Sequence, residues 1–364
     1  MIRYIIWGTG RKAEELYRGY LLTGLSDNFD IIGFVDNDIA KWNKKFHNIN
    51  IYMPSQIKQL QFDFIDIWVL DKYEEIQNQI KEIGVSNEKV VSIFEQFFLK
   101  IFHKYKFSKD VEVRSFLENM KNQRNPGVYS YNPMKKHEMM EAFYDKNKQL
   151  YYVLFEEKKL YLASNYIFTV KNGKKYINNV WQEQDPNSPH LYEQDDIVVE
   201  KGDVLVDAGV CEGNFSLHNI EKVSKLYLIE SDPNWIEALK ATFEPYLDKV
   251  IFCNKFLSDR DTDTMIKLNS LIDEPVNFIK MDIEGEEIKA LKGSDRVFTE
   301  NKDIKCSICA YHKSGNEKEI KNILNDYGMK TVTSRGYMLF IYDDEIWKNP
   351  ELRRGVVRGI KRGV

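Results

Sequence analysis

The stretch Val204-Leu-Val-Asp-Ala-Gly-Val-Cys-Glu-Gly-Asn-Phe215 decides the fold of the second half of this chain. An apolar run is followed by an acidic residue and then by a glycine-rich segment that opens a helical pattern. A second apolar run, Leu226-Tyr-Leu-Ile-Glu230, also ends on a carboxylate. A glycine-rich turn after one strand and an acidic residue after the next is how parallel α/β sheets hold a nucleoside-containing cofactor.

The charges in this turn favour one cofactor over the others. Asp207 and Glu212 put carboxylates where a dinucleotide would place its pyrophosphate. Like charges about 4 Å apart repel by roughly 4 kcal/mol at an effective dielectric constant of about 20. S-adenosylmethionine carries a sulfonium and an ammonium, which carboxylates attract. We therefore expect it here, with Glu230 on the ribose hydroxyls and with Gly209 and Gly213 allowing close backbone approach. The alternative is an ordinary turn without a ligand.

Composition limits the classes of protein that this chain could be. A length of 364 residues predicts two domains, and 43% hydrophobic residues suffice for real cores. A net charge of −4 and a pI near 6.0 provide no electrostatic case for nucleic acid as a partner. The sequence shows no secretory signal and no apolar run long enough to span a membrane. We therefore expect a cytoplasmic location and no transmembrane segment.

The four cysteines do not read as a metal-binding or disulfide framework. Cys306-Ser-Ile-Cys309 has the spelling of a CxxC motif but lies in a run that predicts a buried strand. Residues i and i+3 of a strand face opposite sides. Cys211 and Cys253 do not add a second pair at zinc-finger spacing. Core thiols in a reducing compartment are the interpretation that fits.

Residues 1–100 predict a Rossmann-like N-terminal domain. Helical segments such as 12–20 and 73–83 separate several of its strand candidates, a rhythm typical of a parallel sheet covered by helices. The first turn, Gly8-Thr-Gly10, and Asp36 after the next strand offer a second nucleotide-type loop. It could bind a cofactor or a sugar nucleotide, or it could be a packing device in a domain used for docking or for a homodimer. The strand candidates are 4–8, 30–36, 49–53, 64–70 and 90–94.

Residues 101–195 predict a helical connector followed by aromatic-rich β-hairpins. One hairpin pairs 150–155 with 159–163, and a second pairs 166–170 with 174–178 around Asn172-Gly173. Aromatic surfaces with polar rims suit sugar rings, but aromatic residues are also simply good strand formers. Both interpretations stay open at this stage.

Residues 196–346 predict the cofactor-binding domain, and 347–364 predict a basic tail. Five parallel strands are expected, followed by a terminal antiparallel hairpin that pairs 330–333 with 337–342. This is the layout of a class I methyltransferase sheet. The tail could touch an anionic membrane surface, a nucleotide-sugar pyrophosphate or a polyanionic glycan, or it could be solvated.

Two later motifs resemble those of the FkbM family of methyltransferases. Asn277-Phe-Ile-Lys-Met-Asp-Ile-Glu-Gly-Glu-Glu-Ile-Lys-Ala-Leu-Lys-Gly293 is similar to the Lys-x-Asp-x-Glu-Gly run of that family, which leads into a helix ending near Leu-x-Gly. Leu268–Glu274 resembles its lead-in, with Asn269 where an Asp is often found. Cys309-Ala-Tyr-His-Lys313 resembles its strand-five end, where a His commonly occurs. The resemblance covers about 190–345, and the first domain resembles fusions seen in some members.

The resemblance implies S-adenosylmethionine-dependent O-methylation and a set of site residues. We expect His312 as a general base, because its ordinary pKa lies near neutrality, unless it is a strand-end histidine bonded to a carboxylate. Asp282 is expected near the acceptor or on the cofactor's amino group, and Lys280 is either catalytic or a snorkelling side chain. The expected cofactor-binding residues are Asp207, Gly209, Glu212, Gly213, Phe215, Glu230, Ser231 and Asp282.

The acceptor side is expected to involve His190, Tyr192 and Glu284. Asp282, Glu284 and His312 also compose a set of ligands that a divalent metal could use to lower the pKa of a hydroxyl. Glu284 could instead sit at the N-terminal turn of the following helix as a partner of its dipole.

Four functions remain open. The leading hypothesis is O-methylation of a hydroxyl on a sugar, nucleotide-sugar or glycan, in surface polysaccharide biosynthesis of capsule or O-antigen type. The others are methylation of a secondary metabolite or lipid-linked group, a nucleotide-sugar oxidoreductase that uses the Gly8-Thr-Gly10 loop, and a non-catalytic binding module. The carboxylates and glycines of the second half argue against the last two.

Overall fold

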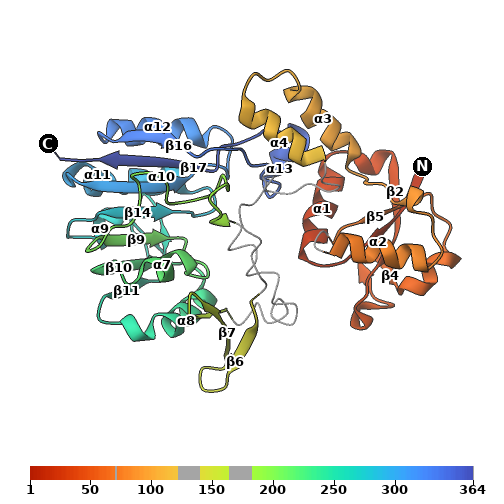
Figure 1. The fold of residues 1–364 in the computed structure, drawn as a ribbon, viewed down its shortest axis with the longest axis horizontal. Helices are drawn as coiled ribbons and strands as arrows, with labels where there is room; N and C mark the ends of the chain where they lie inside the picture. Colours follow the sequence, from red (N-terminus) through yellow and green to blue (C-terminus); the bar gives the residue numbers. More distant parts are fainter. Residues whose placement is uncertain (70–71, 122–139, 164–182, 364) are drawn as a thin grey trace. The chain divides into compact units, whose positions relative to one another are not determined.

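The computed structural model of this chain describes residues 1–69, 72–121, 140–163 and 183–363. The chain forms two compact units (Figure 1). The first comprises Met1–Ser130 with Leu339–Leu352, and the second comprises Tyr131–Met338 with Arg353–Val364. The polypeptide therefore returns to the first unit late in the sequence, which differs from the predicted boundaries at 100, 195 and 346.

The first unit is built on a five-stranded sheet with the order β3-β4-β2-β1-β5. Strands β1, β2, β4 and β5 are parallel, and the short β3 is antiparallel to β4. The predicted strand at 90–94 is reduced to a single bridge between Val90 and Ile65. The elements are β1 (Ile2–Trp7), α1 (Arg11–Leu22), β2 (Phe29–Val35), β3 (Lys45–Phe46), β4 (Ile49–Tyr52), β5 (Phe64–Ile67), α2 (Tyr73–Glu82), α3 (Glu95–Tyr105) and α4 (Val111–Lys121).

The returning segment carries α13 (Asp344–Lys348), which packs into the first unit through Trp347. The Trp347 side chain is fully buried, and its ring lies 4.9 Å from that of Phe97 and 5.4 Å from that of Phe94. A Cβ at Gly19 would lie 2.6 Å from the Trp347 ring, so only glycine leaves room for it on α1. This packing explains why the unit boundary does not follow the sequence order.

In the first unit, the carboxylate of Asp36 holds the glycine-rich loop Gly8-Thr-Gly10 in place. The backbone N–H and the hydroxyl of Thr9 both donate to Asp36 Oδ2, at 3.1 and 2.5 Å, and Lys41 Nζ lies 2.9 Å from the same oxygen. In a dinucleotide fold this carboxylate would accept ribose hydroxyls. The contacts favour the packing interpretation of Gly8-Thr-Gly10 over nucleotide binding.

The second unit contains a seven-stranded sheet with the order β11-β10-β9-β14-β15-β17-β16. The first five strands in this order are parallel, and β17 is antiparallel to both of its neighbours. Its strands are β9 (Val204–Ala208), β10 (Lys225–Ile229), β11 (Val250–Cys253), β14 (Phe278–Met281), β15 (Ile304–Cys309), β16 (Lys330–Thr333) and β17 (Val356–Lys361). A separate two-stranded parallel sheet pairs β12 (Phe256–Leu257) with β13 (Met265–Ile266). The helices are α7 (Asn214–Asn219), α8 (Pro233–Thr242), α9 (Leu268–Leu271), α10 (Glu287–Lys292), α11 (Asp295–Glu300) and α12 (Asn316–Asp326). The predicted α/β fold class with a methyltransferase-type sheet is confirmed.

The predicted partner of β16 and the predicted basic tail are both corrected by this sheet. Residues 337–342 form no strand, and β16 pairs instead with β17, which inserts between β15 and β16 (Figure 1). Arg353 and Arg358 are 6% and 1% exposed, so these charges are not available to a membrane surface or a glycan. The β-branched residues Val356, Val357 and Ile360 are the sequence signal for a strand, and the positive charges around them masked that signal.

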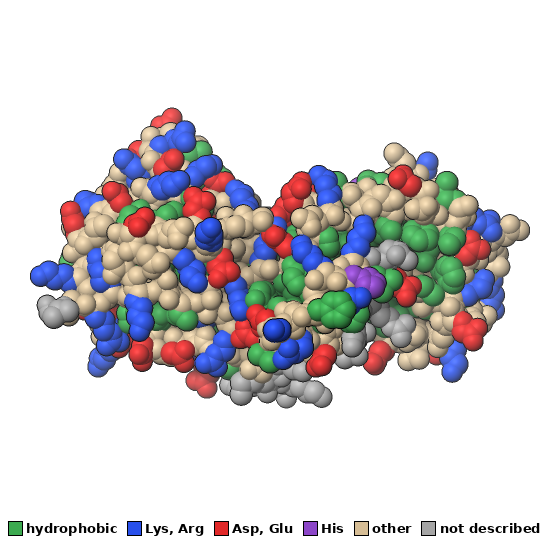
Figure 2. All heavy atoms as spheres, turned by 90° about the horizontal axis from the view of Figure 1, so that it is seen from above, with side chains coloured by type: hydrophobic (Ala, Val, Ile, Leu, Met, Phe, Trp, Pro, Cys, Tyr) green, Lys and Arg blue, Asp and Glu red, His purple; other side chains and the backbone are tan. Residues whose placement is uncertain are grey.

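A small antiparallel sheet with the order β6-β7-β8 precedes the main sheet of the second unit. It contains β6 (Ala142–Asp145), β7 (Leu150–Phe155) and β8 (Lys158–Tyr161), so the first predicted hairpin is confirmed and gains a third strand. The second predicted hairpin, around Asn172-Gly173, lies outside the described residues. Acidic and basic side chains are mixed on the face drawn in Figure 2. Among the helices that the structure describes, none is long and apolar enough to cross a membrane.

Asp66 is a carboxyl group buried in the first unit. It accepts hydrogen bonds from Trp68 Nε1 at 2.9 Å and from the Ile93 backbone N–H at 3.0 Å. Burial outweighs these bonds and raises the pKa of Asp66 from 3.8 to about 7. The folded state therefore binds a proton that the unfolded state has released between these two pH values.

We expect Asp66 to make the chain less stable as pH rises. The contribution of Asp66 to the free energy of unfolding is fully present below pH 3.8, the pKa in the unfolded chain. It is lost as pH rises through about 7, and the total loss is about 4 kcal/mol. Asp66→Asn mimics the protonated form and should flatten this dependence, measured as urea midpoints from pH 4 to 8. Asp30→Asn, at an exposed aspartate, is the control. An unchanged pH dependence in Asp66→Asn would contradict the prediction.

The position of β17 generates a second prediction. A chain that ends at Leu352 should lose cooperative unfolding or melt at a markedly lower temperature, because β15 and β16 lose the strand between them. A chain that lacks only the last two residues should melt like the full chain. Circular dichroism melts compare the three proteins. Equal melting temperatures for the chain that ends at Leu352 and the full chain would restore the solvated-tail interpretation.

Candidate active site

The glycine-rich turn after β9 crosses the end of β14 at very close range. Gly209 has a φ of +72°, and a Cβ at this position would lie 1.7 Å from the backbone oxygen of Asp282. The Asp282 N–H in turn donates to the oxygen of Ala208 at 3.0 Å. No residue other than glycine could bring these two strand ends together. Gly213, with a φ of +80°, then precedes α7.

Asp207 and Lys280 form a buried ion pair beneath this turn. Asp207 Oδ1 lies 3.0 Å from Lys280 Nζ, and the Ser216 hydroxyl donates to Asp207 Oδ2 at 2.7 Å. Lys280 also donates to the oxygen of Gly209 at 2.5 Å. Burial alone would lower the pKa of Lys280, but the carboxylates of Asp207 and Asp282 raise it above its usual range. Lys280 therefore binds the backbone of the turn directly, and Asp207 holds Lys280 in place. This geometry supports positioning roles for both side chains.

Glu230 follows β10 and links two turns through its carboxylate. Its Oε2 accepts the backbone N–H of Cys211 at 2.9 Å, and its Oε1 accepts that of Asp232 at 2.9 Å. The side chain is 6% exposed. Asn254 Nδ2 donates to the backbone oxygens of Glu230 and Ser231. The carboxylate is thus held in one orientation, with lone pairs left for the hydroxyls of a ribose.

The donor set around the turn fits S-adenosylmethionine better than a dinucleotide. Glu230 and the half-buried Glu212 place carboxylates beside the backbone of the turn, where a pyrophosphate would be repelled. Phe215 is buried on α7, and its ring meets that of Tyr192 edge to face at 5.3 Å. Phe215 therefore packs in the core and connects the helix after the glycine-rich turn with the loop that bears Tyr192.

Asp282, directly after β14, is the centre of a hydrogen-bonded group. Tyr192 donates its hydroxyl to Asp282 Oδ2 at 2.7 Å, and Tyr311 donates to Oδ1 at 3.3 Å. The Nε2 atoms of His190 and His312 lie 3.2 Å from Oδ2 and 3.3 Å from Oδ1, respectively. Burial opposes the charged form, but His190, His312 and Lys280 hold the pKa of Asp282 well below its usual range. The carboxylate is therefore ionised at any physiological pH.

His312 lies between carboxylates on both sides of its ring. Glu287 Oε1 is 3.0 Å from its Nδ1, while Asp282 and Glu284 face its Nε2 at 3.3 and 3.7 Å. Burial alone would lower the pKa of His312, but Glu287 and then Asp282 and Glu284 raise it above its ordinary value. A histidine with a raised pKa holds its proton, so this setting favours a hydrogen-bond donor over a base.

Glu287 contacts the candidate site but is not among the residues that the sequence predicted for it. Its side chain is fully buried at the start of α10, and its Oε1 also accepts the backbone N–H groups of Ile283 and Gly285 at 3.0 and 3.3 Å. Glu284 has an exposed side chain and a φ of +57° in the same loop. The available signal was the Glu-Gly-Glu-Glu run, which offers three carboxylates without indicating which one turns inward.

The predicted metal set of Asp282, Glu284 and His312 meets around His312 Nε2, which lies 3.3 Å from Asp282 and 3.7 Å from the exposed Glu284. Among the described residues, ligand atoms lie within 4.8 Å of one another in two groups, one of Asp282, Glu287 and His312 and one of His190, Asp282 and Cys309. In the first group the two carboxylates face opposite ring nitrogens of His312. One ion cannot bind both nitrogens of one imidazole, so the first group is an array of ion pairs around the imidazole.

Two arginines hold the backbone of the site: Arg353 lies just before β17, and Arg358 lies within it. Arg353 Nη1 donates to the oxygens of Tyr311 and His312 at 3.0 and 2.8 Å. Arg358 donates through Nε to the oxygen of Tyr192 at 3.0 Å and through Nη2 to that of Leu191. Burial lowers the pKa of Arg358 to about 10. Of these residues, which were predicted as a tail, Arg358 therefore holds the loop that bears His190 and Tyr192, and Arg353 holds the segment after β15.

Comparisons with known families cover both units. Residues 157–337 match the methyltransferase FkbM domain, and residues 1–91 match a domain described as C2185-like, N-terminal. No curated protein matches the chain. The Rossmann-like assignment of the first domain stays a prediction.

One similar solved structure supports the fold of the whole chain, and others align with a part of it. The methyltransferase FkbM from Methylobacillus flagellatus KT aligns over 98% of this chain and 89% of its own, with a TM-score of 0.50 and 15% identity. Magnesium protoporphyrin IX methyltransferase from Synechocystis PCC 6803 with bound SAM aligns over 44% of this chain and 71% of its own, with a TM-score of 0.31 and 14% identity. Precorrin-6y C5,15-methyltransferase from Geobacter metallireducens GS-15 aligns over 45% and 84%, with a TM-score of 0.33 and 12% identity.

The buried ion pair generates a prediction about stability. Lys280→Met should destabilise the chain by roughly 3–5 kcal/mol, because it leaves the charge of Asp207 buried without a partner. Combining it with Asp207→Asn should recover much of that loss. Lys289→Met, at an exposed pair with Glu286, should cost less than about 1 kcal/mol. Urea unfolding of the unmodified chain, these three variants and the single variant Asp207→Asn measures the differences. Losses in the double variant that equal the sum of the two single losses would argue against the pair.

Proposed function

Residues 157–337 belong to the FkbM methyltransferase family, and from that premise we propose that the chain methylates a hydroxyl of a sugar, nucleotide-sugar or glycan. The chain is an S-adenosylmethionine-dependent methyltransferase of the FkbM type. The proposal adds the oxygen acceptor and the carbohydrate class, with a role in surface polysaccharide biosynthesis of capsule or O-antigen type.

The observation that carries the oxygen acceptor is the ionised carboxylate of Asp282 beside the turn that begins at Gly209. A hydroxyl can donate one hydrogen bond to this carboxylate, which orients a lone pair for an in-line attack. The neighbouring phenols of Tyr192 and Tyr311 and the imidazoles of His190 and His312 supply further polar contacts for a polyol. A sugar, with several hydroxyls on one ring, is the acceptor class that uses such a set.

S-adenosylmethionine supplies a methyl group that is already activated on a sulfonium. Glu230 would bind the ribose hydroxyls with the lone pairs that its two backbone contacts leave over. Glu212 would add negative charge toward the cationic part of the molecule. The Asp207–Lys280 pair would hold the turn, and Phe215 would support Tyr192 from behind.

The acceptor proton would move to Asp282. An alcohol oxygen becomes strongly acidic as it gains the methyl group, so a carboxylate with a low pKa is basic enough to accept that proton late in the reaction. His312, with its raised pKa, would donate to Asp282 and keep it ionised before the transfer. In this proposal His312 positions Asp282, which takes the role of base first expected of the histidine.

The proposed function is tested by supplying the full-length chain with S-adenosylmethionine and a panel of sugars, nucleotide-sugars and oligosaccharides. Mass spectrometry should find one added methyl group on an acceptor oxygen, located by fragmentation. Secondary metabolites and lipid-linked glycans belong in the same panel. Transfer to nitrogen or carbon alone, or a thermal shift with NAD(P) but not with S-adenosylmethionine, would overturn the proposal.

Glu230→Gln tests the cofactor end of the site. We expect it to weaken S-adenosylmethionine binding by at least about tenfold, or roughly 1.4 kcal/mol, because the hydrogen bonds to ribose lose their charge. Isothermal titration calorimetry measures the dissociation constant. Glu237→Gln, at an exposed glutamate on α8, is the matched control and should bind as the unmodified chain does. Equal affinities for both variants would remove Glu230 from the role.

A further inference from the structure

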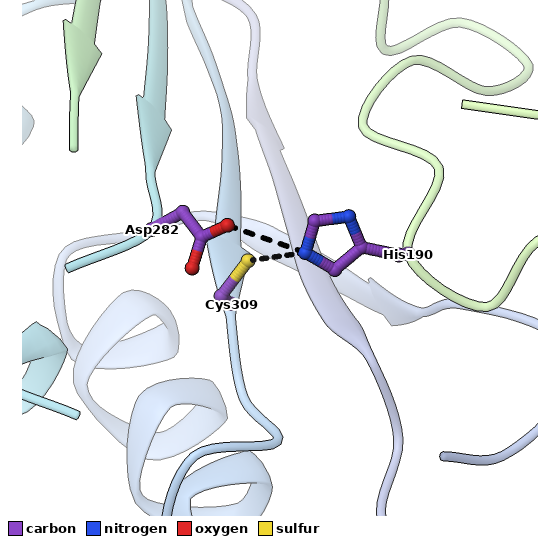
Figure 3. A group of neighbouring side chains, drawn as sticks. All are labelled: His190, Asp282 and Cys309. Carbon is purple, nitrogen blue, oxygen red and sulfur yellow. Dashed lines mark hydrogen bonds and ion pairs between the residues drawn. The ribbon is translucent and has the colours of Figure 1, made fainter. Parts of the chain in front are cut away.

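Three side chains with different ligand chemistry converge beside the candidate site (Figure 3). His190 Nε2 lies 3.2 Å from Asp282 Oδ2 and 3.7 Å from Cys309 Sγ. They come from separate segments, namely the loop before β9, the end of β14 and the end of β15. His190 and Cys309 are 1% and 0% exposed. The tertiary fold therefore brings an imidazole, a carboxylate and a thiol to one point.

Two of the three distances between these atoms match the edges of a tetrahedral zinc site, and the third, between Asp282 and Cys309, is within 4.8 Å. With metal bonds of about 2.0 Å to nitrogen and oxygen and about 2.3 Å to sulfur, tetrahedral angles put N···O at about 3.3 Å and N···S at about 3.5 Å. The observed distances of 3.2 and 3.7 Å are close to both values. We propose that His190, Asp282 and Cys309 bind one Zn²⁺ ion.

The charges of the three groups balance such an ion. A carboxylate and a thiolate neutralise Zn²⁺, and a neutral imidazole completes the set with borderline and soft donors that suit this metal. Burial raises the pKa of Cys309 well above its usual value, so the thiol carries its proton until a metal displaces it. The proton between His190 and Asp282 would leave the contact in the same step and move to the other ring nitrogen or to water.

The surroundings supply the outer contacts that a metal site needs. Tyr192 donates to Asp282 Oδ2 at 2.7 Å, which orients that carboxylate. Tyr311 lies 3.3 Å from both His190 Nε2 and Asp282 Oδ1. Asp282 keeps 17% of its side chain exposed, which leaves one open side. If the proposed O-methylation holds, a fourth coordination position on that side would lower the pKa of the acceptor hydroxyl.

Metal content of the full-length chain tests the site without reference to methyl transfer. The protein is incubated with Zn²⁺, passed through a desalting column and analysed by elemental mass spectrometry. One Zn²⁺ per chain is expected. With Co²⁺ in its place, a near-ultraviolet thiolate-to-cobalt charge-transfer band should report the bond to Cys309.

Matched variants assign the ligands. Cys309→Ser should abolish the charge-transfer band, and His190→Gln should lower the bound metal at least tenfold at equal free Zn²⁺. Cys306→Ser removes another buried thiol of β15 and Cys211→Ser removes the exposed thiol of the cofactor turn, and both should keep the band. Circular dichroism melts show which variants fold.

Two results would overturn the proposal. One is a folded chain that retains no Zn²⁺, which would make the three residues a hydrogen-bonded network only. The other is a charge-transfer band that survives Cys309→Ser and disappears in Cys211→Ser, which would move the metal to the exposed thiol. Because metal content and methyl transfer are measured separately, a failed metal site and a failed O-methylation hypothesis are distinguishable.

Discussion

The buried ion pair between Asp207 and Lys280 is the interaction on which the rest of the site depends. It joins β9 to β14 below the glycine-rich turn, and Lys280 extends the contact to the oxygen of Gly209. The turn can then pass so close to Asp282 that a single Cβ would prevent it. The same contacts therefore hold the glycine-rich turn and the Asp282 carboxylate, and removal of Lys280 would leave an uncompensated buried charge on Asp207.

A second constraint is the path of the chain after β16. The segment 339–352 belongs to the first unit, where Trp347 is fully buried, and the chain then returns to place β17 within the second sheet. On its return it brings Arg353 and Arg358, whose guanidinium groups bind carbonyl oxygens of the site loops. Buried arginines are costly unless their donors are satisfied, and here the carbonyls of residues 191, 192, 311 and 312 satisfy them.

Much of the fold follows from local patterns. Alternating apolar runs and helical segments predict the parallel strands of both sheets, and the loop at Gly209 with Glu230 predicts the nucleoside-binding end of the second sheet. The cysteines of β15 are free and buried as the strand pattern indicates. Local sequence patterns did not predict that β16 pairs with β17, because residues 330–333 and 356–361 are far apart in the chain. The run 353–362 also carries enough positive charge to resemble a solvated tail.

What the sequence by itself determined was the fold class, the position of the cofactor turn and the FkbM resemblance, because these depend on residues close together in the chain. Only the tertiary structure decided what each charged side chain does. It paired Asp207 with Lys280, turned Glu287 toward His312 in preference to Glu284, and set His190 and Cys309 against Asp282. The physical reason is that a charge acquires its role from its partners and its burial, and both arise from segments far apart in the sequence.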